Sequence, residues 1–143
     1  MIAVIDTNVF MAALLNPSGA PAKIRRRWRQ RQFEVLISEA ILEEYTDVLS
    51  QAPTISANEV TILLNELKAF SQHVKISGTL QACKDPDDDI FLETAVAGGA
   101  DFLVTKNLKH FPRKSYSGVR ILKVATFLKE LEKIFPKSAR PSS

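Results

Sequence analysis

The chain has 143 residues, of which 45% are hydrophobic and 24% are charged, and its formal net charge at pH 7 is +3. This length is typical of one globular domain that folds without disulfide bonds, and the only cysteine, Cys83, excludes an internal disulfide or an all-cysteine metal site. No secretory signal precedes the first apolar run, and no segment is apolar over the length of a membrane span. We therefore expect a cytoplasmic protein with one domain over residues 1–135 and a frayed tail over 136–143.

Charge is distributed unevenly along the chain. The net charge is +5 over residues 1–33, −10 over 34–101 and +8 over 102–143. A metal-binding nuclease has this pattern, because carboxylates hold the cation and basic groups attract the phosphates of the substrate. Solvated faces of surface helices give the same pattern, so charge alone does not decide between the two interpretations.

Short apolar runs alternate with helical segments along the first half of the chain. The run at residues 2–5 ends at an acid and predicts a buried strand, and residues 33–37 predict a second strand. Ser38 has the position of an N-cap, and Ser56 is followed three residues later by Glu59, as in a capping box. We predict four helices, over residues 7–15, from Pro21 to about Arg31, from Ser38 to about Leu49 and from Ser56 to about Phe70.

The second half continues this alternation. Strands are predicted at residues 73–76, 102–104 and 119–122. A helix is predicted to begin after Asp85 and to end at the glycines that follow residue 97, and a last helix runs to about Phe135.

The order of these elements is typical of a three-layer α/β/α sandwich with a mainly parallel central sheet of four or five strands. Ligands of such sheets bind beyond the carboxyl ends of the strands. Asp6 and Thr105 each come directly after a predicted strand. We therefore expect both residues at the functional edge of the sheet, although Asp6 is also placed to cap the following helix.

Helical periodicity selects a second acid. The helix after Ser38 has an apolar stripe, and Glu43 and Asp47 lie nearly opposite this stripe, in water. Glu44 lies at the border of the stripe, from which a carboxylate can reach into a cleft. The stripe consists of Ile41, Leu42, Tyr45, Val48 and Leu49.

A third group of acids opens the helix after Asp85. Asp85 precedes a proline and suits an N-cap, and acids in the first turn are favoured by the helix dipole. Asp88 falls at the centre of the core-facing stripe, whereas Asp87 and Asp89 lie about a quarter turn away. A carboxylate in that position is costly unless something satisfies it. The stripe consists of Phe91, Leu92, Ala95 and Val96.

Asp6, Glu44 and Asp88 would form a cation site if they converge. Two like charges about 4 Å apart repel by about 4 kcal/mol at an effective dielectric constant near 20, so the group must take up protons or bind a cation. Oxygen ligands suit Mg²⁺ or Mn²⁺. Zinc is disfavoured, because Cys83, His73 and His110 show no spacing typical of zinc ligands.

At this point the chain resembles the PIN domain family, metal-dependent ribonucleases that include the toxins of VapBC-type toxin–antitoxin pairs. The resemblance covers about residues 2–125, and its four motifs occur in the order and at the spacing of the family. It is strongest to the branch described as putative toxin components. The motifs are Val4-Ile-Asp-Thr-Asn8, Ser38 to Leu49, Asp85-Pro-Asp-Asp-Asp89 running into Glu93-Thr-Ala95, and Ala100 to Asn107.

The resemblance assigns roles to residues of this sequence. It places the metal-binding and catalytic acids of the family at Asp6, Glu44 and Asp88, with Asn8 and Thr105 as supporting residues. Many members have an acid where this chain has Asn107, which keeps an oxygen ligand but lacks a charge. Asp85 or Asp89 would compensate for that loss, and without compensation we expect a second metal ion to bind more weakly.

The resemblance also implies an activity and partners. It implies hydrolysis of RNA with one or two Mg²⁺ or Mn²⁺ ions, which leaves a 5′-phosphate and needs no covalent nucleophile. A recessed site favours single-stranded or looped RNA. An antitoxin protein and a homodimer are implied as partners. The alternative is a catalytically weak or inactive module of the same fold that binds RNA or a protein.

Two basic segments are candidates for contact with nucleic acid. The helix from Pro21 carries Arg25, Arg26 and Arg29, which suit either RNA or an acidic segment of an antitoxin. Lys106 and Lys109 follow Thr105 and are expected near phosphate. In the same helix as the arginines, Trp28 is expected to pack rather than to stack on bases, and both His73 and His110 are interpreted as structural.

Overall fold

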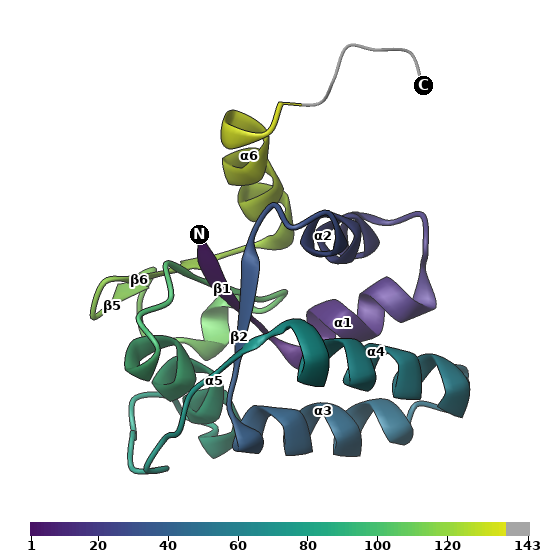
Figure 1. Cartoon of the computed structure of the whole chain (residues 1–143). Coiled ribbons are helices and arrows are strands. Elements are labelled where there is room, and N and C mark those ends of the chain that lie inside the picture. The colour runs from purple at the N-terminus through teal and green to yellow at the C-terminus, as the bar shows by residue number, and fades with distance from the viewer. Residues whose placement is uncertain (137–143) are drawn as a thin grey trace.

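The computed structural model of the chain describes residues 1–136 (Figure 1). Of the tail predicted over 136–143, residues 137–143 lie outside the described residues. Helices and strands alternate as expected over most of the chain. The elements are β1 (Ile2–Ile5), α1 (Thr7–Leu15), α2 (Ala20–Arg29), β2 (Glu34–Ile37), α3 (Glu39–Ser50), α4 (Ala57–Phe70), β3 (Gln72–His73), α5 (Pro86–Ala97), β4 (Phe102–Val104), the 3₁₀ turn η1 (Leu108–His110), β5 (Ser115–Tyr116), β6 (Val119–Leu122) and α6 (Val124–Ile134).

The strands form one sheet in the order β3-β2-β1-β4-β6-β5. All neighbouring pairs are parallel except β5 and β6, which are antiparallel. The central strand β1 is wholly buried over Ala3, Val4 and Ile5, as expected for an apolar strand covered on both faces. In its register with β4, Ile5 lies opposite Val104, so both strands end at the same level.

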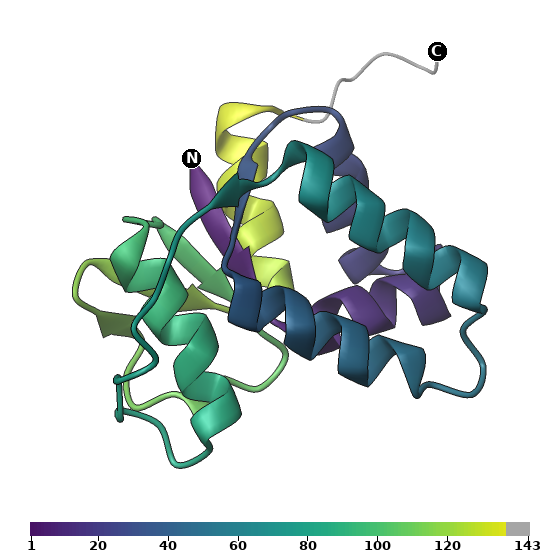
Figure 2. The same ribbon diagram turned by 60° about the horizontal axis from the view of Figure 1, so that its bottom comes forward.

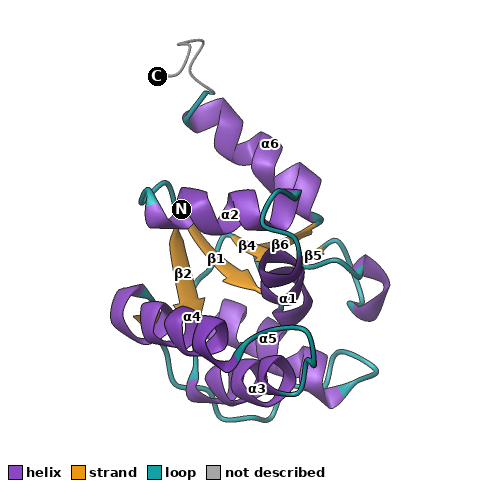
Figure 3. Cartoon of the chain, turned by 90° about the vertical axis from the view of Figure 1, so that its right-hand side faces the viewer, coloured by secondary structure: helices purple, strands orange, loops and turns teal. Residues whose placement is uncertain are grey.

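Helices cover both faces of the sheet (Figure 3). Helices α2 and α6 lie on one side of the strands, and α3, α4 and α5 lie on the other. On the α6 side, Phe127 packs edge-on against Phe33, with ring centroids 5.0 Å apart. Helices α3 and α4 lie side by side, as Figure 2 shows. The predicted three-layer α/β/α sandwich with a mainly parallel sheet is confirmed. None of the helices within residues 1–136 has both the length and the apolar character needed to cross a bilayer.

Helices α3, α4 and α5 begin at the predicted caps. The Ser38 hydroxyl accepts a hydrogen bond from the Ile41 N–H and also bonds the Thr94 hydroxyl at 2.8 Å, which ties α3 to α5. The Ser56 hydroxyl accepts from the Glu59 N–H at 3.1 Å. The Asp85 carboxylate accepts from an N–H of the first turn of α5. These caps supply acceptors for N–H groups that the helices themselves leave unpaired.

Two strands differ from the prediction. Strand β3 covers residues 72–73 rather than 73–76: Val74 still donates to the Ile37 carbonyl, and the chain then leaves the sheet towards Gly78. Strand β5 is an addition to the predicted elements, so the described sheet has six strands instead of four or five. The turn between β5 and β6 has positive φ at Ser117 (47°) and Gly118 (85°), as in the two-residue turns that match the twist of a hairpin.

Two helical details also differ. Helix α2 ends at Arg29 rather than about Arg31, because Arg31 adopts a left-handed backbone conformation with φ of 61°. On α5, Val96 is 37% exposed and does not belong to the buried stripe. Trp28 is buried against Phe10, which confirms that it packs inside.

Candidate active site

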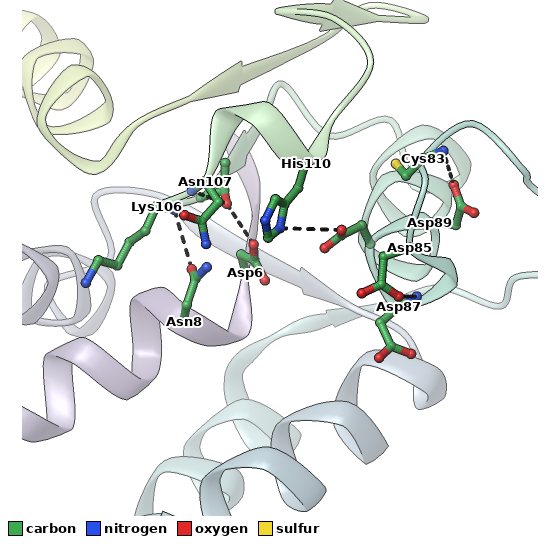
Figure 4. Close-up of polar contacts among 11 residues, drawn as sticks. Asp6, Asn8, Cys83, Asp85, Asp87, Asp89, Lys106, Asn107 and His110 are labelled. Carbon is green, nitrogen blue, oxygen red and sulfur yellow. Dashed lines mark hydrogen bonds and ion pairs between the residues drawn. The ribbon is translucent and has the colours of Figure 1, made fainter.

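The site is built at the point where β1 and β4 end. Asp6 follows β1 and Thr105 follows β4, and the Asp6 N–H donates to the Val104 carbonyl at 2.9 Å. This parallel register places the two side chains next to each other, and the Thr105 hydroxyl donates to Asp6 Oδ2 at 2.7 Å (Figure 4). The expectation that Asp6 and Thr105 lie together at the carboxyl edge of the sheet is confirmed.

Asp6 does not act as a helix cap. Its carboxylate makes no capping hydrogen bond to α1, although the residue has the extended backbone of an N-cap. The residue is only 6% exposed. Burial raises the pKa of Asp6, and the hydrogen bond from Thr105, the adjacent backbone N–H of Thr7 and the charge of His110 offset part of this effect. Its carboxylate is therefore held at the edge of the sheet at an electrostatic cost.

Buried hydrogen bonds hold the backbone just before Asp6 and the Thr105 hydroxyl that contacts its carboxylate. The Tyr45 hydroxyl, on α3, donates to the Ile5 carbonyl, and its ring packs edge-on against Phe10 at 5.3 Å. Thr105 accepts a hydrogen bond from the Asn107 N–H at 3.0 Å while it donates to Asp6. These contacts lock the orientation of the Asp6 side chain.

Asp88 lies in the first turn of α5, within the electrostatic influence of Asp6. Burial raises the pKa of Asp88 to about 6, the charge of Asp6 adds to this effect, and His110 opposes it. The periodicity prediction that Asp88 points inward is confirmed, since the residue is 9% exposed. The two acids come from elements that are distant in sequence, so the fold has brought them into electrostatic contact.

His110 is the residue that sequence reasoning missed. Its Nδ1 atom lies 3.5 Å from Asp88 Oδ2, and the side chain is 53% exposed at the rim of the site (Figure 4). The sequence analysis interprets this histidine as structural, and it shows no spacing typical of zinc ligands. Its position in the loop that follows Thr105, at the carboxyl edge of the sheet, is the signal that points to the site.

Glu44 lies half-buried on α3, at the border of the apolar stripe as predicted. Desolvation is the largest cause of the raised pKa of Glu44. Four acidic neighbours raise it further, in decreasing order Asp87, Asp47, Asp6 and Asp85. Glu44 is therefore coupled most strongly to Asp87 and only third to Asp6 among the acids. Helical periodicity places Asp87 about a quarter turn from the core-facing stripe of α5. In the structure, the charge of Asp87 nevertheless raises the pKa of Glu44 on α3.

The other acids of α5 serve the local structure. Asp85 caps α5, and Asp89 accepts hydrogen bonds from the Ala82 N–H at 2.9 Å and the Cys83 N–H at 2.7 Å. Figure 4 shows Asp89 beside Cys83, on the side of α5 away from Asp6. Asp89 is thus not placed to supply the acid that Asn107 lacks. Desolvation and Asp89 raise the pKa of Cys83 to about 12, so this thiol is a poor nucleophile.

The basic candidates fall into two groups. Arg25 and Arg29 both bind the carboxylate of Glu66, at 2.7 and 2.8 Å, and Arg26 donates to the carbonyl of Pro17. In the second group, Lys106 directly follows Thr105, and its N–H donates to Asn8 Oδ1 at 3.4 Å. Lys109 lies exposed in η1. Of the basic candidates, the two lysines belong to the loop that carries the site.

The oxygen donors at this edge of the sheet suit a divalent cation in their chemistry. Within residues 1–136, no three His, Cys, Asp or Glu side chains lie close enough to hold a metal ion as they stand. The chemistry nevertheless fits Mg²⁺ or Mn²⁺, because Asp6, Glu44 and Asp88 offer oxygen ligands in a site that raises all three pKa values. The buried hydroxyl of Thr7, the residue after Asp6, has no hydrogen-bond partner within residues 1–136. Joint binding of one ion by the three acids stays a prediction.

The fold and the acidic edge of the sheet agree with a comparison to known families. The model of the PIN domain family matches residues 3–109, which run from β1 into η1, and the chain belongs to this family.

Two relatives extend this comparison. The chain is similar to the uncharacterized protein MJ1680 of Methanocaldococcus jannaschii, with 26% identity over 141 residues and 91% of each chain covered. Its structure is similar to a chain in the crystal structure of VapBC2 from Rickettsia felis bound to a DNA fragment from their promoter. That match has a TM-score of 0.57 and 16% identity, and covers 86% of this chain and 98% of the other. The second likeness shows that the two chains share a fold.

Proposed function

We propose that the chain is a metal-dependent ribonuclease that hydrolyses phosphodiester bonds of single-stranded RNA, with Mg²⁺ or Mn²⁺ held by Asp6, Glu44 and Asp88. One observation supports this proposal above the others. Asp6 and Asp88 are both largely buried, the charge of Asp6 raises the pKa of Asp88, and within residues 1–136 neither acid forms an ion pair with a lysine or arginine. A dication relieves this repulsion.

Several residues of the site have separate roles in the proposed reaction. A bound dication lowers the pKa of a water ligand and neutralises charge on the phosphate. Thr105 orients the Asp6 carboxylate, and Asn107 offers a neutral oxygen as an additional ligand. His110, when protonated, reduces the repulsion between Asp88 and the phosphates of the strand. Water is the nucleophile in this scheme, which is consistent with the raised pKa of the Cys83 thiol. The scheme predicts a product that carries a 5′-phosphate.

Cleavage of a fluorescently labelled single-stranded RNA, with Mn²⁺ or with EDTA, tests the proposal. Asp6→Asn is expected to reduce the rate at least about a hundredfold, since it removes a ligand charge. Glu44→Gln is expected to do the same, whereas Glu43→Gln, its exposed neighbour on α3, is expected to cleave like the wild type. Equal cleavage by the wild type and Asp6→Asn would mean that the activity comes from a contaminant.

The alternative is a module of this fold that binds RNA or a protein without cleaving. Two observations favour it: the three acids do not form a closed metal site within residues 1–136, and Asn107 replaces an acid that many family members have. Absence of cleavage by the wild type with metal present, together with retained binding of RNA, would support this alternative.

We further propose that the protein is the toxin of a toxin–antitoxin pair and forms a homodimer. The similar solved structure is that of VapBC2 bound to a DNA fragment from their promoter. In this chain, a groove of about 320 Å³ between α1, α2 and α4 is lined by three arginines, by Glu59 and by apolar residues, among them the exposed Ile62. Arg25 and Arg29 are paired with Glu66, whereas Arg26 forms no ion pair within residues 1–136. Such a surface suits an acidic, amphipathic segment of a protein partner. Copurification with the product of an adjacent small reading frame, and light scattering of the isolated chain, test the two partner proposals.

A further inference from the structure

A cavity lies on the far side of Thr105 from the Asp6 carboxylate, so Thr105 borders both the cavity and the candidate active site. The cavity has a volume of about 580 Å³ and is bordered by the loop after β4 and by the first turns of α2 and α6. Thr105 lines it while its hydroxyl bonds Asp6. Thr105 is fully buried, so one side chain separates the cavity from the Asp6 carboxylate.

The charged groups of the cavity are all positive. Lys106 and Lys123 line it, and none of the other lining residues is acidic or basic. Within residues 1–136 neither lysine forms an ion pair. Figure 4 shows the Lys106 side chain leading away from Asp6. Lys123 is the N-cap residue of α6. The first turns of α2 and α6 contain no acid, so their N–H groups add to the positive potential.

The rest of the wall is mostly apolar, supplied by Leu15, Pro21, Val124 and alanines of α1, α2 and α6. A nucleotide combines an anionic phosphate with the flat, weakly polar face of a base. Proteins that bind single strands without sequence preference use cationic grooves next to surfaces on which bases rest. The cavity has both features, at a volume that accepts one nucleotide.

We propose that this cavity binds the nucleotide next to the scissile phosphodiester of a single-stranded nucleic acid. The phosphate of that nucleotide lies between Lys106 and Lys123, and its base or ribose lies on the apolar wall. This subsite rests on the proposed function, because the strand enters it from the carboxylates around Asp6. Nucleic acid is favoured over an acidic peptide because Thr105 joins the cavity to the site of phosphate chemistry.

Fluorescence anisotropy with a labelled 12-nucleotide single-stranded RNA in EDTA measures binding without cleavage. Lys123→Gln and Lys106→Gln are each expected to raise the Kd on the order of tenfold. The slope of log K against log salt concentration is expected to become shallower by about 0.7 for each phosphate that is no longer neutralised. Lys129→Gln is the matched control: it removes the same charge from an exposed position of α6 outside the cavity. It is expected to bind like the wild type.

A second variant separates repulsion from misfolding. Ala125→Asp puts an acid into the first turn of α6, where the helix dipole favours negative charge, so the fold is expected to be at least as stable. The same acid repels a phosphate in the cavity and is expected to weaken RNA binding on the order of tenfold. Wild-type affinity in Ala125→Asp and Lys123→Gln would overturn the subsite.

The outcomes distinguish the subsite from the nuclease proposal. Wild-type cleavage with unchanged KM in the cavity variants overturns the subsite and leaves the nuclease intact. If the wild type does not cleave RNA but the cavity variants still bind RNA more weakly than it does, the nuclease proposal fails and the cavity remains a nucleotide-binding site. If the variants lose affinity for an acidic peptide of glutamate residues but not for RNA, the cavity is a protein-docking surface and the proposal fails.

Discussion

Thr105 and Asp6 are 99 positions apart in the sequence, and the hydroxyl of the first donates a 2.7 Å hydrogen bond to the carboxylate of the second. The parallel register of β1 and β4 produces this contact. Both residues are buried, so the bond is shielded from water and sets the direction in which the free carboxylate oxygen points. Asn107 extends the arrangement through its N–H, which donates to Thr105.

Thr105→Val tests the role of this hydroxyl. The variant keeps the shape of the side chain but leaves Asp6 without its donor, so we expect a loss of about 1–2 kcal/mol in the free energy of unfolding. We expect divalent-ion affinity or cleavage rate to fall about 10- to 100-fold, as for other residues that orient metal ligands. Thr105→Ser restores the donor and is expected to recover the activity. Equal activity of the valine and serine variants would show that the hydroxyl does not position Asp6.

Asp88→Asn is expected to stabilise the protein in EDTA. Because the pKa of Asp88 is raised from 3.8 to about 6 in the folded state, the native protein binds more protons than the unfolded chain between these values. This group therefore lowers stability as pH rises from about 4 to about 6, and its charge is unfavourable at pH 7.

Thermal unfolding of wild type and Asp88→Asn at several pH values measures this effect. After allowance for solvent screening, we expect the variant to gain on the order of 1 kcal/mol at pH 7, or about 3 °C in Tm, and no advantage at about pH 4. Glu43→Gln, which neutralises an exposed acid on α3, is the control. A gain that is the same at both pH values would contradict the electrostatic explanation.

Asn107→Asp tests whether the neutral side chain at this position weakens metal binding. Figure 4 shows Asn107 beside Asp6, where an added carboxylate would increase the negative charge available to a cation. We expect the Kd for Mn²⁺, measured by calorimetry, to fall about tenfold. Asn58→Asp adds the same charge at an exposed position of α4 and should leave the Kd unchanged. An unchanged Kd in Asn107→Asp would mean that residue 107 does not reach the ion.

Gly98→Ala tests the packing of α5 on the sheet. A Cβ atom at residue 98 would lie 2.3 Å from Leu36 Cδ2, so the side chain of β2 or the helix end must move. We expect a loss of about 1–3 kcal/mol in the free energy of unfolding, measured by urea denaturation. Ala97→Ser, an exposed change one residue earlier, is expected to cost less than about 0.5 kcal/mol. A neutral Gly98→Ala would show that this contact is loose.

The amino-acid pattern was sufficient to predict the fold class and the inward direction of Asp88. Apolar runs identified the buried strands, and serine and aspartate caps identified three helix starts, because these signals are local. The short strand β5 was missed because two residues carry too little pattern, although Ser117-Gly118 is a turn signal. The end of α2 depends on the backbone of Arg31, which residue type alone does not predict.

The directions of the neighbouring side chains, Asp87, Asp89 and His110, were not predictable. Asp87 and Asp89 occupy neighbouring positions of one helical turn, yet Asp89 turns to the loop at Cys83 and Asp87 acts on Glu44. His110 reaches Asp88 only because the loop after β4 folds back over the sheet edge. Such outcomes depend on tertiary packing between segments that are far apart in sequence.

The proposed nuclease depends on a dication that Asp6 and Asp88 hold together. Anomalous diffraction from crystals of the protein soaked in Mn²⁺ would locate this ion. We predict one strong peak within about 2.5 Å of a carboxylate oxygen of each residue, and its loss in Asp6→Asn crystals soaked in the same way. Absence of a peak between these carboxylates, at a Mn²⁺ concentration that supports RNA cleavage by the wild type, would contradict shared binding of the ion.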